Sequence, residues 1–329
     1  MTSDSVLDLL AEPLDAANLR RLLTASGDLQ QALFDQARQR RDAHVGPAVT
    51  LRGVIEISNY CQKTCDYCAM RPLNKSLTRY RLPDETILAI SADIKAAGIG
   101  TVFLQSGQDR KCDDILERVI PQIKNGLGQN LLLNVGEKPK EEYRKYRELG
   151  ADSFILKFET SDPALYEAVA HSPLAKRLEC IGWLQELGFR VGTGNIIGLP
   201  GQTLDTLAGD IQLAARIKPD FVSSSPFIPN QNTPYEQVPN GSLPITLNSI
   251  AICRILFPNA LIPSVSALEK IEAGGQARGL DAGANVLTIN FTPPESREKF
   301  AIYSQQRFVV SLEHALKTVD QAGLQANLH

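Results

Sequence analysis

The sequence lacks a marked excess of charge, a long apolar run and any internal repeat. Its 34 basic and 37 acidic residues leave a net charge of -3, with no basic stripe, so a nucleic-acid partner is not expected. No apolar run reaches the length of a membrane span, and the first residues carry acids where a signal peptide carries a basic flank. We expect a cytoplasmic protein with neither a membrane nor a nucleic-acid partner.

Histidine and cysteine are also scarce, with four and six residues. In a reducing compartment, clustered cysteines bind metal or act chemically more often than they form disulfides. Three of the six form a C-x3-C-x2-C pattern at Cys61, Cys65 and Cys68. A structural zinc site would need a fourth ligand, and His44 and His171 are isolated, while a disulfide would leave one cysteine over. Both alternatives are therefore disfavoured.

From residue 49 onward, short β-rich runs alternate with longer helical stretches, which is typical of a parallel sheet wrapped by helices. Eight strands would close a (βα)8 TIM-type barrel, an α/β fold in a single domain. Residues 1–48 have helix-like apolar spacing and are expected to form an N-terminal helical cap on the barrel of residues 49–329. The expected strands are 54–60, 101–107, 130–136, 153–160, 190–198, 221–228, 261–268 and 284–291.

Alternation along each expected strand indicates which side chains point into the barrel. In 153–160, the apolar face of Phe154, Leu156 and Phe158 suits the helix layer, so the intervening residues should point inward. The resulting interior is unusually polar and implies a wet or ligand-filled cavity, unless several alternations are off by one residue and the polar groups bond among themselves. The side chains expected inside are Glu56, Ser58, Gln105, Asn134, Ser153, Ile155, Lys157, Glu159, Thr193, Asn195, Ser264, Ser266, Thr288 and Asn290.

The three clustered cysteines follow the first expected strand, at the carboxyl-end mouth where barrel enzymes keep their chemistry. Three thiolates can hold three irons of a 4Fe-4S cube and leave the fourth iron open to a small-molecule chelate. The spacing and the position together therefore predict an iron-sulfur site with one open iron.

Further motifs follow along the chain in a fixed order. In that order they resemble the radical SAM (S-adenosylmethionine) superfamily, and within it the HydE maturases of FeFe-hydrogenase, in the group that also holds biotin synthase and methylornithine synthase. The residues that carry the resemblance are the three cysteines followed by AMRPLNK (69–75), RYR (79–81), LQSGQD (104–109), FET (158–160), GLPGQT (198–203) and PFIP (226–229).

The resemblance implies a 4Fe-4S cluster on Cys61, Cys65 and Cys68, with SAM as the chelate of the open iron. An electron from a low-potential donor of flavodoxin or ferredoxin type would cleave SAM to methionine and a 5'-deoxyadenosyl radical. The radical would act on a small polar substrate, amino-acid-derived or thiol-containing, inside the barrel. The protein is expected to be a monomer.

The resemblance also implies roles for single residues in binding SAM. The turn at Ser106, Gly107 and Gln108 would accept the SAM amino group through backbone carbonyls, although an ordinary strand-to-helix turn is the alternative. Glu159 would bind the ribose hydroxyls and Arg177 the carboxylate, with a solvated helix position as the competing interpretation for Arg177. The implied neighbours of the adenine are Tyr67 and residues 195–198, including Asn195 and Ile197.

The substrate half of the site departs from the HydE pattern. Asn134, Thr193, Ser266 and Thr288 are the expected substrate-binding residues. Lys157 is the candidate catalytic residue, because a buried ammonium needs a partner and Glu159 is expected to face the ribose. We expect Lys157 to meet an anionic group of the substrate, with an internal ion pair to Glu56 as the alternative.

Two other functions stay open from the sequence. One is a mutase similar to methylornithine synthase, and the other is a non-catalytic iron-sulfur scaffold, which would not release 5'-deoxyadenosine from SAM. The second cluster of biotin synthase is not expected, because Cys180 and Cys253 fall in helical stretches and Cys112 in an expected loop.

Overall fold

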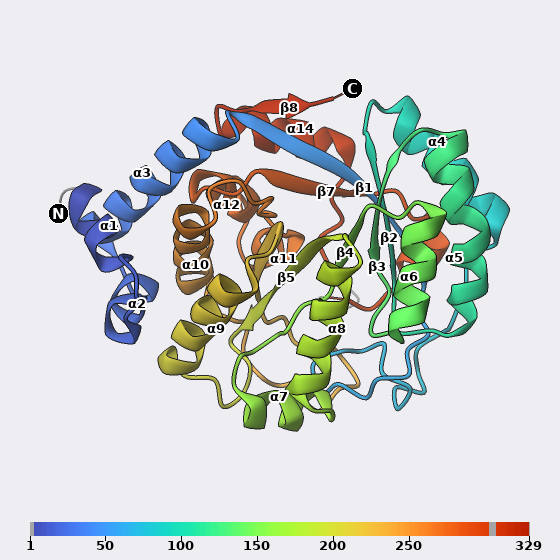
Figure 1. The fold of residues 1–329 in the computed structure, drawn as a ribbon, viewed down its shortest axis with the longest axis horizontal. Coiled ribbons are helices and arrows are strands. Elements are labelled where there is room, and N and C mark those ends of the chain that lie inside the picture. Colours follow the sequence, from blue (N-terminus) through green and yellow to red (C-terminus); the bar gives the residue numbers. More distant parts are fainter. Residues whose placement is uncertain (1–2, 303–306, 329) are drawn as a thin grey trace.

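The computed structural model describes residues 3–302 and 307–328. Its centre is a curved sheet of parallel strands, with helices on the outside (Figure 1). Long apolar strands of this kind are buried on both faces, as in other parallel sheets. The strands are β1 (Ala48–Ser58), β2 (Thr101–Ser106), β3 (Asn130–Asn134), β4 (Ser153–Ile155), β5 (Arg190–Ile197), β6 (Phe221–Pro226), β7 (Val286–Asn290) and β8 (Gln325–Asn327).

The sheet runs in the order β6-β5-β4-β3-β2-β1-β7, so consecutive strands are neighbours except where β1 meets β7. Single bridges from Phe221 to Leu261 and from Pro263 to Val286 connect β6 with β7 and close the barrel. The strand β8 pairs with residues 48–50 of β1, ahead of the part of β1 that pairs with β2. The predicted α/β barrel of TIM type is confirmed.

The helices surround the sheet and alternate with its strands along the chain (Figure 1). They are α1 (Ser3–Leu9), α2 (Ala16–Leu23), α3 (Gly27–His44), α4 (Asp84–Ala96), α5 (Lys111–Pro121), the π-helix η1 (Gln122–Gly126), α6 (Lys140–Leu149), α7 (Pro163–Ala170), α8 (Leu174–Glu186), α9 (Leu204–Ile217), α10 (Leu243–Leu256), α11 (Ser266–Ile271), α12 (Gly275–Asp281), α13 (Pro294–Arg297) and α14 (Leu312–Gln321). Within the described ranges, no helix is both long and apolar enough to cross a bilayer.

The N-terminal helices lie at one side of the barrel, where α2 packs on α9 and α10, α3 packs on α10, and α1 packs on α2 and α3 (Figure 1). Asn248 of α10 is fully buried there, and its side-chain amide donates to the carbonyls of Leu23 and Ala25 at 2.9 Å each. Gln30 of α3 donates to the Asn248 carbonyl oxygen at 2.8 Å. The predicted helices before residue 48 are present, and the division into cap and barrel at that point stays a prediction.

The predicted apolar face of β4 does pack toward the helices. Phe154 is fully buried, and its ring meets those of Tyr143 and Phe189 edge-on, with centroids 5.1 and 6.0 Å away. Leu156 and Phe158 are also buried and belong to the same apolar cluster as Phe154. Edge-to-face ring contacts add about 1 kcal/mol each beyond the burial of apolar area. This packing turns the intervening residues toward the barrel interior.

The seventh expected strand, 261–268, is wrong in its second half. Leu261 and Pro263 make single bridges, and the chain then enters helix α11 at Ser266. Ser266 therefore stands at the start of a helix, although its side chain still lines the barrel cavity. Pro263 has no backbone N–H to donate, which limits regular strand pairing at this position.

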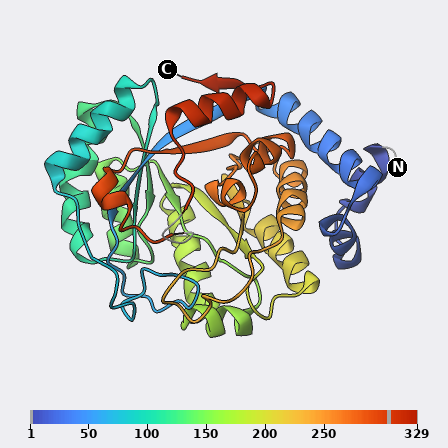
Figure 2. The ribbon, with the colours of Figure 1, turned by 180° about the vertical axis from the view of Figure 1, so that it is seen from behind.

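Two long segments meet over the carboxyl ends of the strands (Figure 2). One is the cysteine-bearing loop of residues 59–82, and the other follows β7 as residues 291–302 and 307–311. Their contact is a small apolar cluster, separate from the main core, that contains Ala69, Met70, Leu77, Phe300 and Ala301. The two segments thus form one wall around the mouth of the barrel.

Candidate active site

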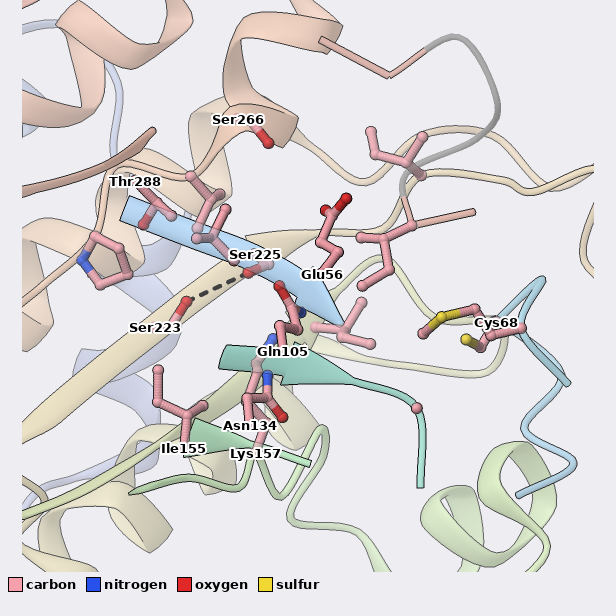
Figure 3. Close-up of a pocket in the computed structure, with 18 of the residues that line it drawn as sticks. Glu56, Cys68, Gln105, Asn134, Ile155, Lys157, Ser223, Ser225, Ser266 and Thr288 are labelled. Atoms are coloured by element: carbon pink, nitrogen blue, oxygen red, sulfur yellow. Dashed lines mark hydrogen bonds between the residues drawn. The ribbon is translucent and has the colours of Figure 1, made fainter. Parts of the chain in front are cut away.

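One cavity of about 350 Å³ opens at the carboxyl ends of the strands and extends into the barrel. Figure 3 shows Cys68 at one end of it, Thr288 and Ser223 at the other, and Glu56, Gln105, Asn134 and Lys157 between them. A pocket of this size with a few convergent polar groups is the usual form of a small-molecule site. The cavity therefore joins the thiols to the polar interior of the barrel.

All three predicted cysteines line this cavity. The Cys61 sulfur accepts two backbone N–H groups, from Lys63 and Gln108, each at 3.4 Å. Such hydrogen bonds stabilise a negative sulfur and tune a bound cluster. The other cysteines are buried elsewhere, and Cys112 lies in helix α5 rather than in the expected loop.

Two of the three thiols are held where the uncharged form is favoured. Burial raises the pKa of Cys65 and that of Cys68, and at Cys68 the neighbouring Cys61 and Cys65 sulfurs add to the effect. Three mutually repelling thiolates in a dry pocket need cations to neutralise them. The residues present therefore fit a metal cluster that would displace the thiol protons.

Among the described residues, no three histidine, cysteine or acidic side chains converge as ligands of one metal ion. The thiolates of a 4Fe-4S cube each bind a different iron, so they surround the cube and need not meet at one point. The arrangement thus suits a cluster better than a mononuclear metal.

The turn after β2 packs against the cysteine loop without space between them. A β-carbon at Gly107 would lie 2.2 Å from the Tyr60 carbonyl oxygen and 2.7 Å from the Cys61 Cβ, so only glycine fits. The Ser106 hydroxyl donates to the Gly107 carbonyl at 2.7 Å, and the Gln108 carbonyl accepts from the Gln62 N–H at 3.0 Å. Ser106, Gly107 and Gln108 all line the cavity beside Cys61.

Glu159 is held by the backbone in an unusual conformation. Its φ of 63° is left-handed, and it bridges to Asn195 one residue out of step with the pairing of Ile155 to Gly192. The carboxylate lines the cavity, as the alternation with Lys157 predicts, and its Oε2 is buried and has no hydrogen-bond partner within the described chain. An orphaned carboxylate oxygen of this kind can accept ligand hydroxyl groups.

Lys157, predicted to point inward, does line the cavity. Its Nζ lies 3.4 Å from Glu159 Oε2, within ion-pair distance but without a hydrogen bond. The alternative ion pair between Lys157 and Glu56 is wrong, because Glu56 pairs bidentately with Arg307 at 2.5 Å for both bonds. Sequence reasoning missed Arg307, which lies outside any helix or strand.

Arg177 is buried on α8 and lines the cavity, so the solvated helix position is wrong. Its Nε donates to Glu137 Oε1 at 2.7 Å, and Nη1 donates to the Lys157 carbonyl at 3.0 Å. Lys63 donates to the other Glu137 oxygen at 3.0 Å. Burial alone would raise the pKa of Glu137, but Arg177 and Lys63 outweigh it and lower that pKa.

The expected adenine segment on β5 faces the other way from the prediction. Asn195, expected inside, donates to Asp210 of α9 at 2.9 Å and is absent from the described cavity wall, as is Ile197. Ile196 lines the cavity in their place. The Gln202 side chain closes the following loop, accepting from Gly198 N–H at 2.6 Å and donating to the Ile196 carbonyl at 2.8 Å.

Tyr67 lines the cavity between the second and third cysteines, as predicted. Its carbonyl accepts from the Asn230 side chain at 3.0 Å, which ties the cysteine loop to the segment after β6. Burial raises the pKa of Tyr67 well above its usual value. The ring therefore presents a neutral hydroxyl and an apolar face to the cavity.

The expected substrate residues lie deeper in the cavity, and the hydroxyl of one of them, Thr193, bonds to the backbone. Thr193 donates to the Leu156 carbonyl at 3.0 Å and accepts from Phe158 N–H at 3.3 Å, so its hydroxyl serves the backbone of the neighbouring chain. Thr193 still lines the cavity, as do the other three expected residues: Asn134, Ser266 and Thr288.

Arg52 at the deep end of the cavity was not foreseen. Its guanidinium donates to the Thr288 hydroxyl at 2.7 Å and lies over the Phe103 ring, 5.0 Å from the centroid. The sequence did contain a signal for it, because Arg52 lies four residues before Glu56 on β1 and therefore on the same, inward face of the strand. The expected strand began at residue 54 and so left Arg52 out.

Fold and site together define an iron-sulfur barrel enzyme with SAM as its partner molecule. The family model described as the Radical SAM superfamily matches residues 55–214. The chain belongs to this superfamily, and it is an enzyme that uses a 4Fe-4S cluster and SAM, takes electrons from a reductant and acts on a small molecule.

Two curated relatives and one solved structure narrow the class. The chain is 38% identical over 275 residues to the [FeFe] hydrogenase maturase subunit HydE of Thermotoga maritima, covering 83% of this chain and 79% of that protein. It is 31% identical over 286 residues to 3-methylornithine synthase of Methanosarcina acetivorans, covering 85% and 80%. The crystal structure of methylornithine synthase (PylB) matches with a TM-score of 0.84 and 25% identity, covering 98% of this chain and 96% of that one. The protein is thus a HydE-like radical SAM enzyme.

Proposed function

We propose that this enzyme holds its cluster on Cys61, Cys65 and Cys68 and acts on a small, polar, amino-acid-derived or thiol-containing molecule that carries an anionic group. One observation carries the proposal: the same cavity is lined by these three thiols at its mouth and by Lys157 and Asn134 inside. The cluster and SAM, when bound, supply a 5'-deoxyadenosyl radical. Such a species needs a cavity that excludes solvent.

The SAM position rests on groups near the thiols that still lack partners. The Glu159 Oε2 oxygen is buried without a hydrogen bond and can accept ribose hydroxyls. Arg177 already donates to Glu137 and to the Lys157 carbonyl, so it would bind the SAM carboxylate through its remaining N–H groups. Tyr67 and Ile196 offer apolar surface for the adenine.

The proposed anionic group of the substrate is inferred from the charged side chains around Lys157. Glu56 is neutralised by Arg307, which leaves Glu159 as the carboxylate near Lys157 among the described ion pairs. If Glu159 accepts ribose hydroxyls, its attraction for Lys157 is shared, and a substrate carboxylate would complete the pairing. The proposed donor of electrons is a protein of flavodoxin or ferredoxin type, and the proposed state is a monomer.

The test is the release of 5'-deoxyadenosine. Protein reconstituted with iron and sulfide is mixed with dithionite and SAM, and the products are separated by chromatography. The proposal predicts 5'-deoxyadenosine and methionine in equal amounts. A cluster-loaded protein that leaves SAM intact would contradict the proposal and favour a scaffold.

The rival function is a mutase that rearranges an amino-acid skeleton, and the relative named 3-methylornithine synthase favours it. A carboxylate at Lys157 suits both substrate classes. L-lysine, a diamino acid isomeric with 3-methylornithine, and L-cysteine, each in deuterated form, can separate them, because radical attack transfers deuterium from the true substrate type into 5'-deoxyadenosine. Transfer from the diamino acid alone would favour the mutase.

A further inference from the structure

The loop that carries the cysteines has little regular structure to hold it. Between β1 and α4, residues 59–82 form turns, with a single antiparallel bridge from Arg81 back to Ser58. Most of the described backbone hydrogen bonds inside it are short-range turns, such as Cys68 N–H to Cys65 O at 3.3 Å, and one long bond of 3.4 Å from Asn59 N–H to Tyr80 O joins its two ends. A loop of this length would be mobile unless side chains fixed it.

Arg79 supplies the missing connections. Its Nη1 donates to the carbonyls of Asn59 at 2.7 Å and Met70 at 2.8 Å, and its Nη2 donates to those of Arg71 at 2.7 Å and Asn74 at 3.2 Å. Asn59 precedes Cys61 by two residues, and Met70 follows Cys68 by two. One guanidinium thus ties together the two ends of the C-x3-C-x2-C segment.

The charge of Arg79 differs from those of its neighbours. The cations Lys63, Arg71 and Arg81 in the same loop each pair with a carboxylate. Within the described ranges, no carboxylate lies at ion-pair distance from Arg79, and its guanidinium donates to carbonyl oxygens. Partial burial lowers the pKa of Arg79, and the Cys61, Cys68 and Tyr60 side chains oppose this shift.

We propose that Arg79 is a positioning residue for the iron-sulfur cluster, which fixes the thiolate loop through four carbonyls and places an uncancelled positive charge beside the bound cluster. The inference rests on the proposed ligands Cys61, Cys65 and Cys68. It has two consequences. Loss of the fork-shaped donor set should loosen the loop and speed iron loss. Loss of the charge should make the cluster harder to reduce, because reduction adds a negative charge beside it.

Two variants separate the consequences. Arg79→Lys keeps the charge but cannot reach four carbonyls, and Arg79→Gln removes the charge as well. Arg216→Gln is the matched control, since Arg216 is exposed on α9, away from the cysteine loop. The reconstituted holoenzymes are compared by the rate of iron loss to a chelator and by the midpoint potential in an EPR-monitored redox titration.

Both Arg79 variants should lose iron about tenfold faster than wild type or the control. Arg79→Gln should also titrate at a more negative potential, while Arg79→Lys should stay near the wild-type value. Iron retention and potential equal to wild type in Arg79→Gln would overturn the proposal. If Arg79→Gln does not fold, the iron-loss rate of Arg79→Lys decides, and a wild-type rate overturns it.

A further arm separates this inference from the proposed function. Cys65→Ala is reconstituted in parallel and its iron is counted. If Cys65→Ala loses its iron and the Arg79 variants keep theirs, only the role of Arg79 fails. If Cys65→Ala holds as much iron as wild type, the ligand assignment itself fails, and the role of Arg79 fails with it.

Discussion

Glu159 concentrates several unusual features in one residue. It has a left-handed backbone, φ 63°, which for a residue other than glycine costs about 1 kcal/mol or more. Its carboxylate has a buried oxygen without a hydrogen bond, beside Lys157. Strain and an unsatisfied polar atom at the same residue are typical of a ligand site, because the fold must offset both costs elsewhere.

Glu159→Gln should weaken SAM binding by about 1.5 to 3 kcal/mol, since a charge-assisted hydrogen bond to the ligand is lost. Titration calorimetry measures the affinity of the reconstituted protein for SAM. The thermal midpoint should change little, because within the described chain Glu159 Oε2 has no hydrogen bond to lose. An unchanged SAM affinity would show that the position was wrongly assigned.

Arg177 is expected to behave differently from Glu159. Arg177→Ala would remove one of the two described ion-pair partners of the buried Glu137, leaving Lys63, and would free the Lys157 carbonyl. Breaking a buried pair on one side costs about 3 to 5 kcal/mol. Urea unfolding should therefore show a clear loss of stability, and a variant as stable as wild type would contradict the structural role of this pair.

Lys157→Met should abolish turnover of the substrate while the cluster, SAM affinity and stability are kept. The reason is that Lys157 has an ion-pair contact to Glu159 at 3.4 Å but no hydrogen bond to it. Substrate-dependent product and urea unfolding are measured on the same preparation. A fall in stability of several kcal/mol would instead reveal a structural ion pair and remove the reason for an anionic substrate.

The residues foreseen from the sequence are those whose pattern is local. The cysteine spacing and the alternation around Lys157 and Glu159 lie within ten residues each, and both place their side chains at the cavity. The pair of Glu56 with Arg307 joins residues 251 positions apart, and no local pattern indicates it. Glu56 was therefore left as a possible partner for Lys157 until the fold showed otherwise.

At the scale of the elements, helix α9 connects the two chain segments proposed to hold the nucleoside. Asp210 of α9 is buried. It accepts from the Asn195 side chain of β5 at 2.9 Å and from the N–H of Ser161 at 2.6 Å, and Ser161 lies two residues after Glu159. Burial raises the pKa of Asp210 to about 6, and the hydrogen bonds from Asn195 and Ser161 oppose the shift.

The raised pKa of Asp210 gives a signed pH effect. Because the folded value, about 6, lies above the ordinary value of 3.8, this group stabilises the fold at acidic pH and the contribution is lost as pH rises through 6. Between pH 5 and 7.5 the loss is about 1 kcal/mol. In Asp210→Asn this component should vanish, so the difference in unfolding free energy between variant and wild type should shift in favour of the variant by about that amount. Urea unfolding at both pH values measures it, and a pH-independent difference would contradict the assignment.

The errors at the element scale have physical causes. On β5 the cavity wall includes Gly192, which has no side chain, and the apolar Ile196, so the polar Thr193 and Asn195 gave the visible alternation although Asn195 faces α9. On the seventh expected strand, Ser266 begins a short helix after Pro263. Both errors shifted single side chains and left the barrel order intact.

The whole molecule was the easiest level to predict. Strand and helix alternation, with chemistry at the carboxyl ends, follows from a parallel sheet closed into a barrel, and the fold confirms it. Similarity to HydE over 83% of the chain then gives the superfamily and its cofactors. The substrate could not be read in this way, because it depends on a few side chains deep in the cavity, such as Arg52, that come together only in the folded chain.

The proposed function depends most on the cluster at Cys61, Cys65 and Cys68. The most direct measurement is the visible absorption and iron content of reconstituted Cys65→Ala beside Cys180→Ala, whose thiol is buried on α8 outside the described cavity wall. We predict that Cys65→Ala loses the brown 4Fe-4S absorption and the release of 5'-deoxyadenosine, because three thiolates are the fewest that hold the cube with one iron open. Cys180→Ala should keep both. A cluster that survives in Cys65→Ala and disappears in Cys180→Ala would contradict the account.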